Sequence, residues 1–479
     1  MRRLVFSLHR WIGLLLGPVM LLWCLSGFVM MYMPYPSLTS DEARQARPVL
    51  DLDNCCDTAP MESLGLVDVH RFELSMRAGR PVLQVIASNG QRPLLDLSSG
   101  ELIAEVDAAE ARVIAEEFQR LRGIKGALGD GERLQVDQWT VSAALDPHRP
   151  LYRFAAQDEA GSEWYISSRS GEVLQFTTAR QRFWNWLGAV PHWLYPTVLR
   201  QHDGLWAQVV IVLSLLGSFL TALGLYIGIS RWRRLPSGRH SPYRGLALWH
   251  HYAGLACGLF LLTWAASGLF SMRPWGWFDS AGRVEVMRRL EGLPLFSAEV
   301  ASVVERLPTA ELPVDTLAVE GYAQLGKLYL LLHRQDGSVL RLDGRSLQPA
   351  PEPDWKALAR QVAGRAGIRD ASMLEREDTY YYDGHDITGE LPAYRLILDD
   401  AQQTRIYLDA VSGELIAYVD GAEKRYRWLF SALHSLDVGW LRSRPLWDLV
   451  MLLLLAGATL GSLTGLLMGL RLLRRQGRR

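Results

Sequence analysis

Four long apolar runs interrupt an otherwise polar chain of 479 residues. Each run is free of charged residues over about 20 positions or more, which is the length that a helix needs to cross the hydrocarbon core of a membrane. The runs cover residues 11–33, 205–230, 252–272 and 449–470. The pattern therefore predicts four transmembrane helices, and the even number places both chain ends on the same side of the membrane.

The two polar stretches between the runs mix helical and strand patterns. Residues 107–121 have the capped, amphipathic pattern of a helix, and residues 298–307 and 354–366 are further helical candidates. Strand patterns around turns predict strand pairs at residues 94–104, 164–176, 327–342 and 394–419. The expected fold class is a membrane protein with four transmembrane α-helices and two α+β domains that contain antiparallel sheets.

The whole pattern occurs twice in the chain. The segment HRWIGLLLGPVMLLWCLSG from His9 reappears as HHYAGLACGLFLLTWAASG from His250, at a constant offset of 241 residues (250 − 9). WLGAVPHWL around His192 matches WLFSALHSL around His434, and the polar segments that start at Tyr152 and Tyr394 also match. Self-similarity at a fixed period indicates two tandem halves, each built from a span, a polar domain and a second span.

Arginine is concentrated in the short segments next to the apolar runs. These residues are Arg2 and Arg3 before the first run, Arg231, Arg233, Arg234, Arg239 and Arg244 between the second and third, and Arg471, Arg474, Arg475, Arg478 and Arg479 after the fourth. The positive-inside rule predicts that all three segments are cytoplasmic, and that the polar domains lie on the other side. The first run is too long for a signal peptide and lacks an A-x-A-like cleavage site, which predicts a retained helix.

Each half carries one histidine near each side of the membrane. His9 and His250 lie near the cytoplasmic ends of the first and third runs, and His192 and His434 precede the second and fourth runs on the outer side. Histidine at such a position is costly and is a functional candidate by default. Haem iron takes two axial imidazoles, so the repeat predicts one haem between His9 and His250 and another between His192 and His434.

Several neighbouring residues leave alternatives open. Gly13 and Gly17 share a helix face with His9, as Gly254 and Gly258 do with His250. These glycines would make room for a flat macrocycle, or would simply let the helices pack closely. His251, which the repeat aligns with Arg10, is the rival of His250. His202 has Arg444 at the aligned place and is an extra ligand, a substrate-side residue or an interfacial hydrogen-bonding residue. The remaining histidines are expected to be solvated, namely His70, His148, His240, His333 and His385.

Cysteine spacing, glycine motifs and net charge limit the cofactors and partners that the chain is expected to bind. The four cysteines form no C-x-x-C motif; Cys24 and Cys257 lie inside runs, and adjacent Cys55 and Cys56 are either paired with another partner or free. No dinucleotide or phosphate-binding glycine motif is present, and the predicted cytoplasmic loop is too short for a flavin domain. Electrons would therefore come from a membrane quinol or a separate cytoplasmic donor. A formal net charge of zero gives no reason to expect a nucleic acid partner.

Three turn segments resemble the D-x-x-[ST]-G-x-[IVL] signature of PepSY domains, namely LLDLSSGELI, YISSRSGEVL and IYLDAVSGELI. With the His and Ser-Gly pattern of the flanking helices, nearly the whole chain resembles the PepSY-associated transmembrane family. The resemblance implies a multi-pass protein of the bacterial inner membrane, with haem b between its helices, that reduces ferric iron in a siderophore or another iron chelate. In YISSRSGEVL, Ser167 replaces the usual Asp, so that Asp is not essential in every copy.

The expected organisation has seven parts. These are transmembrane helix 1 in residues 1–33, a periplasmic PepSY-like domain in 34–180, an interfacial segment and helix 2 in 181–230, a cytoplasmic loop in 231–242, helix 3 in 243–272, a second periplasmic PepSY-like domain in 273–424, and an interfacial segment, helix 4 and a cytoplasmic tail in 425–479. The alternative is a membrane protein without redox activity, whose PepSY domains bind peptides, proteases or envelope partners. A third hypothesis is a small transporter built on the repeat.

Overall fold

The computed structural model describes residues 2–53, 55–59, 61, 69–236, 238, 240–382 and 390–476. His385, Arg239, Arg478 and Arg479 lie outside the described residues. Four described helices are long and apolar enough to cross a membrane: α1 (Arg2–Met30), α8 (Asp203–Arg231), α9 (Leu246–Ser271) and α14 (Leu446–Gln476). The predicted fold class is confirmed, because α+β regions lie between these helices in a multi-pass membrane protein.

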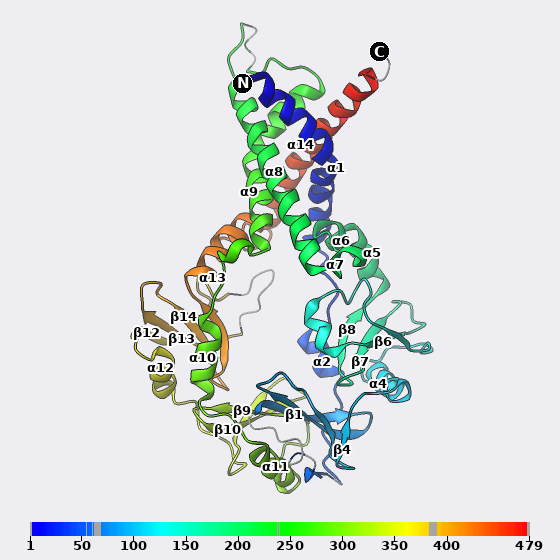
Figure 1. The fold of residues 1–479 in the computed structure, drawn as a ribbon, viewed down its shortest axis with the longest axis vertical. Coiled ribbons are helices and arrows are strands. Elements are labelled where there is room, and N and C mark those ends of the chain that lie inside the picture. The colour runs from blue at the N-terminus through cyan, green and yellow to red at the C-terminus, as the bar shows by residue number, and fades with distance from the viewer. Residues whose placement is uncertain are drawn as a thin grey trace. The chain divides into compact units, whose positions relative to one another are not determined.

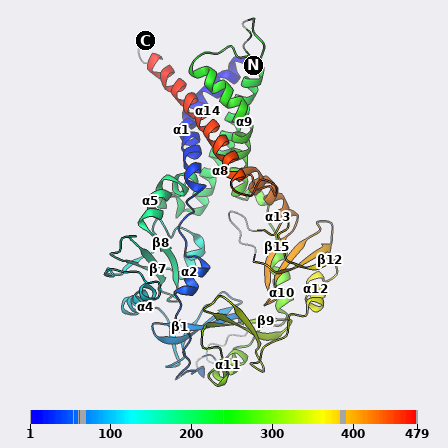
Figure 2. The ribbon, with the colours of Figure 1, turned by 180° about the vertical axis from the view of Figure 1, so that it is seen from behind.

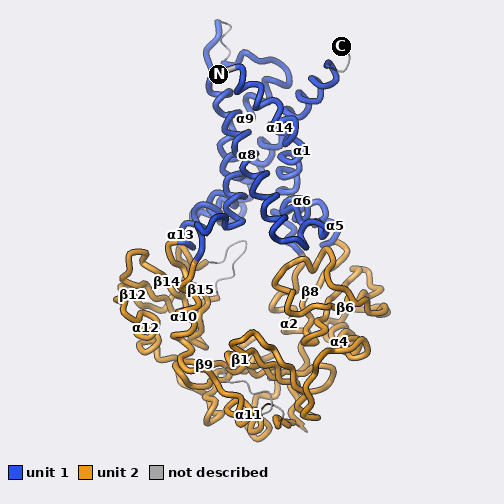
Figure 3. Tube along the Cα trace, viewed as in Figure 1, with its two compact units in different colours: residues 1–35, 181–279, 422–479 blue, residues 36–180, 280–421 orange. Residues whose placement is uncertain are grey.

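The chain forms two compact units, which Figure 3 shows in different colours. Unit 1 contains residues 1–35, 181–279 and 422–479, and unit 2 contains residues 36–180 and 280–421. The seven parts expected from the sequence, with their boundaries, stay predictions.

The four long helices of unit 1 form one bundle (Figures 1 and 2). Helix α1 packs against α8 and α14, and α9 packs against the same two helices. The repeat-related helices α1 and α9 therefore lie on opposite corners of the bundle. The start of α1 and the end of α14 lie at the same end of the bundle (Figure 1). The shorter helices of this region are α5 (Ala179–Leu187), α6 (Ala189–His192), α7 (Thr197–Arg200), the 3₁₀ turn η2 (Pro274–Gly276), α13 (Gly421–Tyr426) and the π-helix η4 (Arg427–Ala432).

Unit 2 contains three antiparallel sheets in its described part, with strand orders β11-β10-β9-β1-β2-β3-β4, β5-β6-β7-β8 and β12-β13-β14-β15. The strands of the first half are β1 (Val69–Arg77), β2 (Arg80–Ala87), β3 (Leu94–Asp96), β4 (Glu101–Ile103), β5 (Glu132–Leu134), β6 (Leu151–Ala155), β7 (Glu163–Ser167) and β8 (Val173–Thr177). Those of the second half are β9 (Thr316–Gln324), β10 (Lys327–Arg334), β11 (Val339–Asp343), β12 (Gly367–Leu374), β13 (Ala393–Asp399), β14 (Arg405–Asp409) and β15 (Leu415–Val419).

The seven-stranded sheet joins the two halves of the repeat. Strand β1 of the first half pairs with β9 of the second, and Leu74 lies opposite Val319. Both residues are fully buried. Pairing β1 with β9 covers two strand edges that would otherwise expose unpaired N–H and C=O groups. The two polar regions expected from the sequence therefore share one sheet.

All three predicted helices of unit 2 form, and two of them begin with a side-chain cap. Asp107 accepts the backbone N–H of Glu110 at the start of α4 (Ala108–Leu121), and Asp354 caps α12 (Trp355–Ala363) in the same way. Helix α11 (Ser297–Arg306) covers the third helical candidate. The remaining helical elements of unit 2 are α2 (Ser40–Gln45), η1 (Ala143–His148), α10 (Gly282–Glu291) and η3 (Leu307–Thr309). The sequence did not predict helix α10 or the strands β1, β2, β5, β6, β9 and β12.

The number of strands predicted for one segment is wrong. Residues 394–419 contain three strands rather than a pair, because two turns interrupt the segment. Thr404 and Asp400 hold the first turn, since the Thr404 backbone N–H donates to the Asp400 carboxylate at 2.8 Å. The expectation for the adjacent cysteines also needs correction, because Cys55 and Cys56 form a disulfide with each other.

Candidate functional site

His9 of α1 and His250 of α9 form the first histidine pair, inside the helix bundle. Their ring centroids are 6.1 Å apart. The Nδ1 atom of His9 lies 3.2 Å from the carbonyl oxygen of Leu220, and Nδ1 of His250 lies 2.9 Å from that of Gly461. A carbonyl oxygen can only accept, so each Nδ1 carries the proton and donates it. Each neutral ring then keeps its lone pair on Nε2, for which the described residues provide no hydrogen-bond partner.

Two glycines on the facing helices let these rings reach the carbonyls. Gly224 follows Leu220 by one helical turn in α8, and Gly465 follows Gly461 in the same way in α14. A Cβ atom at Gly224 would lie 2.8 Å from Cε1 of His9, and one at Gly465 would lie 2.9 Å from Cε1 of His250. Any side chain there would displace the imidazole. Neither glycine is among the residues predicted from the sequence, although the two occupy equivalent positions of the repeat.

His192, at the end of α6, and His434, two residues after η4, form the second histidine pair. Their ring centroids are also 6.1 Å apart. The Nδ1 atom of His192 lies 3.0 Å from the hydroxyl oxygen of Ser26 in α1, and Nδ1 of His434 lies 2.9 Å from that of Ser267 in α9. Both serines are buried, with exposures of 1% and 0%.

The serine hydroxyls determine the tautomer of the second pair. Each hydroxyl donates its own proton to a backbone carbonyl three residues earlier, that of Trp23 or Trp264, at 3.1 Å in both cases. The oxygen is then left to accept, so Nδ1 of His192 and of His434 carries the proton. Each Nε2 again keeps its lone pair and has no hydrogen-bond partner among the described residues. All four imidazoles therefore present the same nitrogen as a free ligand.

The spacing of both pairs suits a single metal ion between the two rings. Two metal–imidazole bonds of about 2 Å in line, with each ring nitrogen lying between the metal and its centroid, place the centroids roughly 6 Å apart. The described residues include no group of three or more His, Cys, Asp or Glu side chains that could hold a metal ion. Each pair thus offers two nitrogen ligands, which is the number that a bis-histidine haem takes from a protein.

Two buried donors near the second pair also lack partners. The indole N–H groups of Trp23 and Trp264 are buried, and they have no hydrogen-bond partner in the described part of the chain. They occupy equivalent positions of the repeat, one helical turn from Ser26 and Ser267. An indole N–H usually finds a partner when buried. These two donors fit a bound group with acceptor atoms in the bundle.

The two rival ligands, His251 and His202, have surroundings that differ from those of the paired histidines. Nε2 of His251 lies 2.9 Å from the carbonyl oxygen of Gly228, and its Nδ1 lies 2.8 Å from the hydroxyl of Ser241. Both ring nitrogens are therefore engaged, which favours His250 as the ligand. His202 is exposed at the start of α8, and neither pair includes it.

The predicted glycine stripes have different surroundings. An added Cβ at Gly17 would lie 3.5 Å from Leu466, and one at Gly258 would lie 2.8 Å from Leu225. Gly13 has Leu220 at 3.5 Å, and Gly254 has no atom within 4 Å. These contacts favour the helix-packing alternative for Gly17 and Gly258. A role for the four glycines beside a cofactor stays a prediction.

Four other histidines have partners rather than solvent alone. His70 lies 3.0 Å from Glu291, and His333 lies 3.0 Å from Glu320. His148 lies 3.7 Å from Glu172, and His240 stacks on Trp232 with ring centroids 5.3 Å apart. The expectation that these histidines are solvated holds for His70 and His240, which are exposed, whereas His148 and His333 are partly buried.

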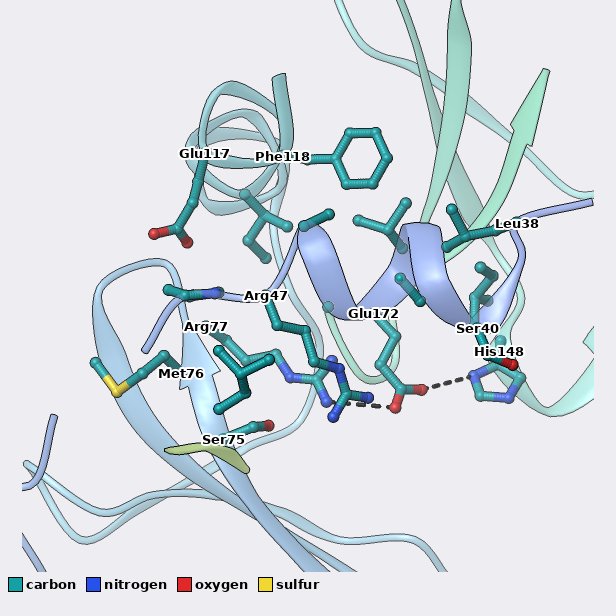
Figure 4. Close-up of a pocket in the computed structure, with 18 of the residues that line it drawn as sticks. Leu38, Ser40, Arg47, Ser75, Met76, Arg77, Glu117, Phe118, His148 and Glu172 are labelled. Carbon is teal, nitrogen blue, oxygen red and sulfur yellow. Dashed lines mark hydrogen bonds and ion pairs between the residues drawn. The ribbon is translucent and has the colours of Figure 1, made fainter. Parts of the chain in front are cut away.

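A pocket of about 460 Å³ lies within unit 2, between α2, α4, the end of β1 and the β7–β8 turn (Figure 4). Its polar side holds Arg77 3.3 Å from Glu172, which in turn faces His148. Burial raises the pKa of Glu172, but Arg77, the Ser170 hydroxyl and His148 together outweigh it and hold the pKa below its usual value. Ser75, only 4% exposed, has a hydroxyl with no partner among the described residues. Leu38 and Phe118 are part of the apolar side.

The family is decided by a match along almost the entire chain. A model described as the PepSY-associated TM region matches residues 6–471. The chain belongs to this family. The match includes both histidine pairs and the two serines that bind the second pair. No match was found among curated proteins.

The PepSY turns of this family member explain the departure at Ser167. In the β7–β8 turn, the Ser167 hydroxyl accepts the backbone N–H groups two and three residues later, both at 3.0 Å. Asp96 and Asp409 accept the corresponding N–H groups in their own turns. The signature position therefore closes the turn, and a hydroxyl can make the same two contacts, although it accepts more weakly than a carboxylate.

Proposed function

We propose that this PepSY-associated TM protein is a di-haem electron-transfer protein of the bacterial inner membrane. It would reduce a substrate on the periplasmic side, ferric iron held by a siderophore or another iron chelate. One observation carries the proposal: two repeat-related pairs of imidazoles, each 6.1 Å apart between centroids, present four free Nε2 lone pairs.

In this proposal His9 and His250 hold one haem b, and His192 and His434 hold the other. Bound haem supplies the one-electron chemistry, while the protein supplies the ligands, their tautomers and a bundle that excludes water. The 17 residues from His9 to Ser26 correspond to about 25 Å along α1. That length is close to the roughly 30 Å of a hydrocarbon core. The two pairs would therefore carry electrons across most of the bilayer.

The proposed orientation places the first pair near the cytoplasm and unit 2 in the periplasm, with both chain ends cytoplasmic. A membrane quinol or a separate cytoplasmic donor would supply the electrons. A quinol that becomes a quinone releases two electrons and two protons, and each electron reduces one ferric ion to ferrous. Hard oxygen ligands hold ferrous iron less tightly than ferric iron, so reduction favours release from the chelator.

The first test is a reduced-minus-oxidised visible spectrum of the full chain in detergent, with haem measured per chain. We expect a b-type spectrum and two haems per chain, falling to about one in His9→Ala and in His434→Ala, because each variant removes one axial ligand. His251→Ala and His202→Ala are matched controls that keep both haems. A colourless protein after haem-replete expression would overturn the proposal.

The second candidate is a binding module without redox activity, which takes peptides, proteases or envelope partners. The pocket of unit 2 favours it, because the unpartnered Ser75 hydroxyl and an apolar wall face the same space. A chain with all four paired histidines replaced by Ala would then support growth on a ferric siderophore as well as the wild type does. Failure of that variant, with its pocket intact, would favour the electron-transfer function.

A further inference from the structure

Helix α5 turns its polar side chains toward the protein and its apolar side chains outward. Asn185 is completely buried, and Gln181, one turn earlier on the same face, is partly buried. Four large apolar residues have exposed fractions between 40% and 60% instead, namely Phe183, Trp184, Trp186 and Leu187. A surface helix in water has the opposite arrangement, with its apolar stripe on the core. The polarity of α5 is therefore inverted relative to that of a helix surrounded by water.

The buried side of α5 is fixed to the end of α1 and to the chain that leaves it. The Asn185 amide nitrogen donates to the carbonyl oxygens of Pro34 and Gln181, both at 2.9 Å. Just after the helix, a Cβ at Gly188 would lie 2.9 Å from Cγ1 of Val29 in α1. The hydrogen bonds and this close approach determine which face of α5 points outward. Its apolar face cannot turn inward unless the buried amide loses these acceptors.

The second half of the repeat shows the same inversion. At an offset of 242 residues (427 − 185), Arg427 corresponds to Asn185 and Trp428 corresponds to Trp186. Arg427 is buried in η4 and donates to the carbonyl oxygen of Asp437 at 2.6 Å, whereas Trp428 is 45% exposed. Each half therefore buries a polar side chain and exposes the tryptophan that follows it.

Exposed apolar residues continue along the chain from α5 into a membrane span. Trp193, Val198 and Leu205 are all exposed, and Leu205 belongs to α8, one of the four candidate spans. Helices α5 and α6 lie at the end of the bundle opposite the start of α1 (Figures 1 and 2). The apolar face of α5 is thus next to the place where a span begins, which is where tryptophan is enriched in membrane proteins.

We propose that α5 lies in the membrane–water interface and that its outward face binds the phospholipids of the leaflet at this end of the bundle. Trp428 of η4 makes the same contact in the second half. Lipid then covers an apolar face that water would leave exposed, and the indole rings lie at the level of the headgroups. His192 follows Gly188 by four residues, so the lipid contact of α5 fixes the depth of His192 in the membrane. The inference goes beyond the proposed function and does not depend on haem.

A nitroxide label in the full chain, reconstituted in nanodiscs, tests which medium surrounds α5. Cys24→Ala with Cys257→Ala gives the background, because these are the free cysteines. Oxygen collides more often with a label in lipid, and a water-soluble nickel complex collides more often with a label in water. We expect the oxygen-to-nickel collision ratio to be at least about fivefold higher for Phe183→Cys and Trp186→Cys than for a label in water.

Val113→Cys on α4 is the matched control in water. Val113 is 49% exposed, close to the 53% of Trp186, and it belongs to unit 2, whereas the four candidate spans belong to unit 1. Trp428→Cys should give the same increase as the labels on α5. It tests the contact in the other half, so the inference stays falsifiable if one α5 variant fails to fold.

The outcomes separate lipid from other surroundings of this face. Collision ratios on α5 equal to that of Val113→Cys would place the helix in water and overturn the inference. Low collision rates with both reagents would mean that protein, such as a second copy of the chain, covers the face, and would overturn it as well. A protein that lacks haem but shows the expected ratios would contradict the proposed function and support this inference.

Discussion

At the scale of single residues, the site depends on which nitrogen of each imidazole carries the proton. In the first pair a backbone carbonyl accepts the Nδ1 proton and so fixes the tautomer. In the second pair a serine hydroxyl, which donates its own proton to a backbone carbonyl, fixes the same tautomer. The bundle places each acceptor from a different segment of the chain, so the lone pairs are set before any ligand binds. Preorganisation of this kind orients ligands that a flexible side chain would leave free to rotate.

Gly224 gives a residue-scale prediction about the first pair. Gly224→Ala should expel His9 from the Leu220 carbonyl, because the new Cβ would lie 2.8 Å from the ring. We expect haem per chain to fall from two to about one, measured from the visible spectrum of the purified variant. Alanine is a better helix former than glycine, so a weakened helix would not explain the loss.

Gly254→Ala is the matched control for this prediction, since no atom lies within 4 Å of its added Cβ. It should keep both haems. A Gly224→Ala protein with two haems per chain would show that His9 does not depend on this contact.

At the scale of elements, the two halves of the repeat are joined where β1 pairs with β9, a contact called here the β1–β9 joint. Arg71 of β1 forms ion pairs with Glu320 of β9 and with Glu414, next to β15. Burial raises the pKa of Glu414 from 4.5 to about 7, although Arg71 acts in the opposite direction. The joint therefore contains a carboxyl group that is costly to ionise in the folded chain.

The raised pKa predicts how stability depends on pH. Between pH 4.5 and about 7 the folded chain keeps the Glu414 proton that the unfolded chain has released, so stability falls as pH rises through this window. Glu414→Gln should remove this dependence, an effect of at most about 3 kcal/mol above pH 7. Thermal unfolding at pH 5 and pH 8 measures it.

A Gln variant of the exposed Glu101 serves as the control, and it should keep the wild-type pH dependence. If Glu414→Gln loses the same stability at both pH values, the ion pair with Arg71 outweighs the burial of the carboxyl group.

At the scale of the whole molecule, the proposed function gives the two histidine pairs different tasks. The first pair's haem would receive electrons from the donor, and the second pair's haem would pass them to the substrate. His9→Ala should block reduction by a quinol, but its second haem, once reduced with dithionite, should still be oxidised by a ferric chelate. His192→Ala should slow that oxidation at least tenfold, because the haem nearest the substrate is lost. Stopped-flow absorbance, with a ferrous-specific chromophore to count the iron, measures both steps.

If no ferric chelate oxidises the reduced haems of the wild-type protein, the proposed substrate is wrong. The proposed electron path between the two histidine pairs would still stand. If the wild-type protein is reduced only by a soluble donor, the electron donor is not a quinol. The proposed haems and the proposed substrate would be unaffected by that result.

The sequence by itself determined the four spans, the tandem repeat and the family, because an apolar run of sufficient length and a fixed offset are properties of the chain in one dimension. The repeat also predicted which histidines would pair. Only the tertiary structure decided the acceptors of the Nδ1 protons, since His9 and Leu220 are 211 residues apart and Ser26 and His192 are 166 apart.

The same reason applies to the glycines and to the shared sheet. Gly224 matters because α8 packs against α1, and β1 finds its partner in β9 of the other half. A local pattern shows that a strand exists or that a residue is small. It does not show which distant segment will lie against that position, because packing between segments far apart in the chain selects the partner.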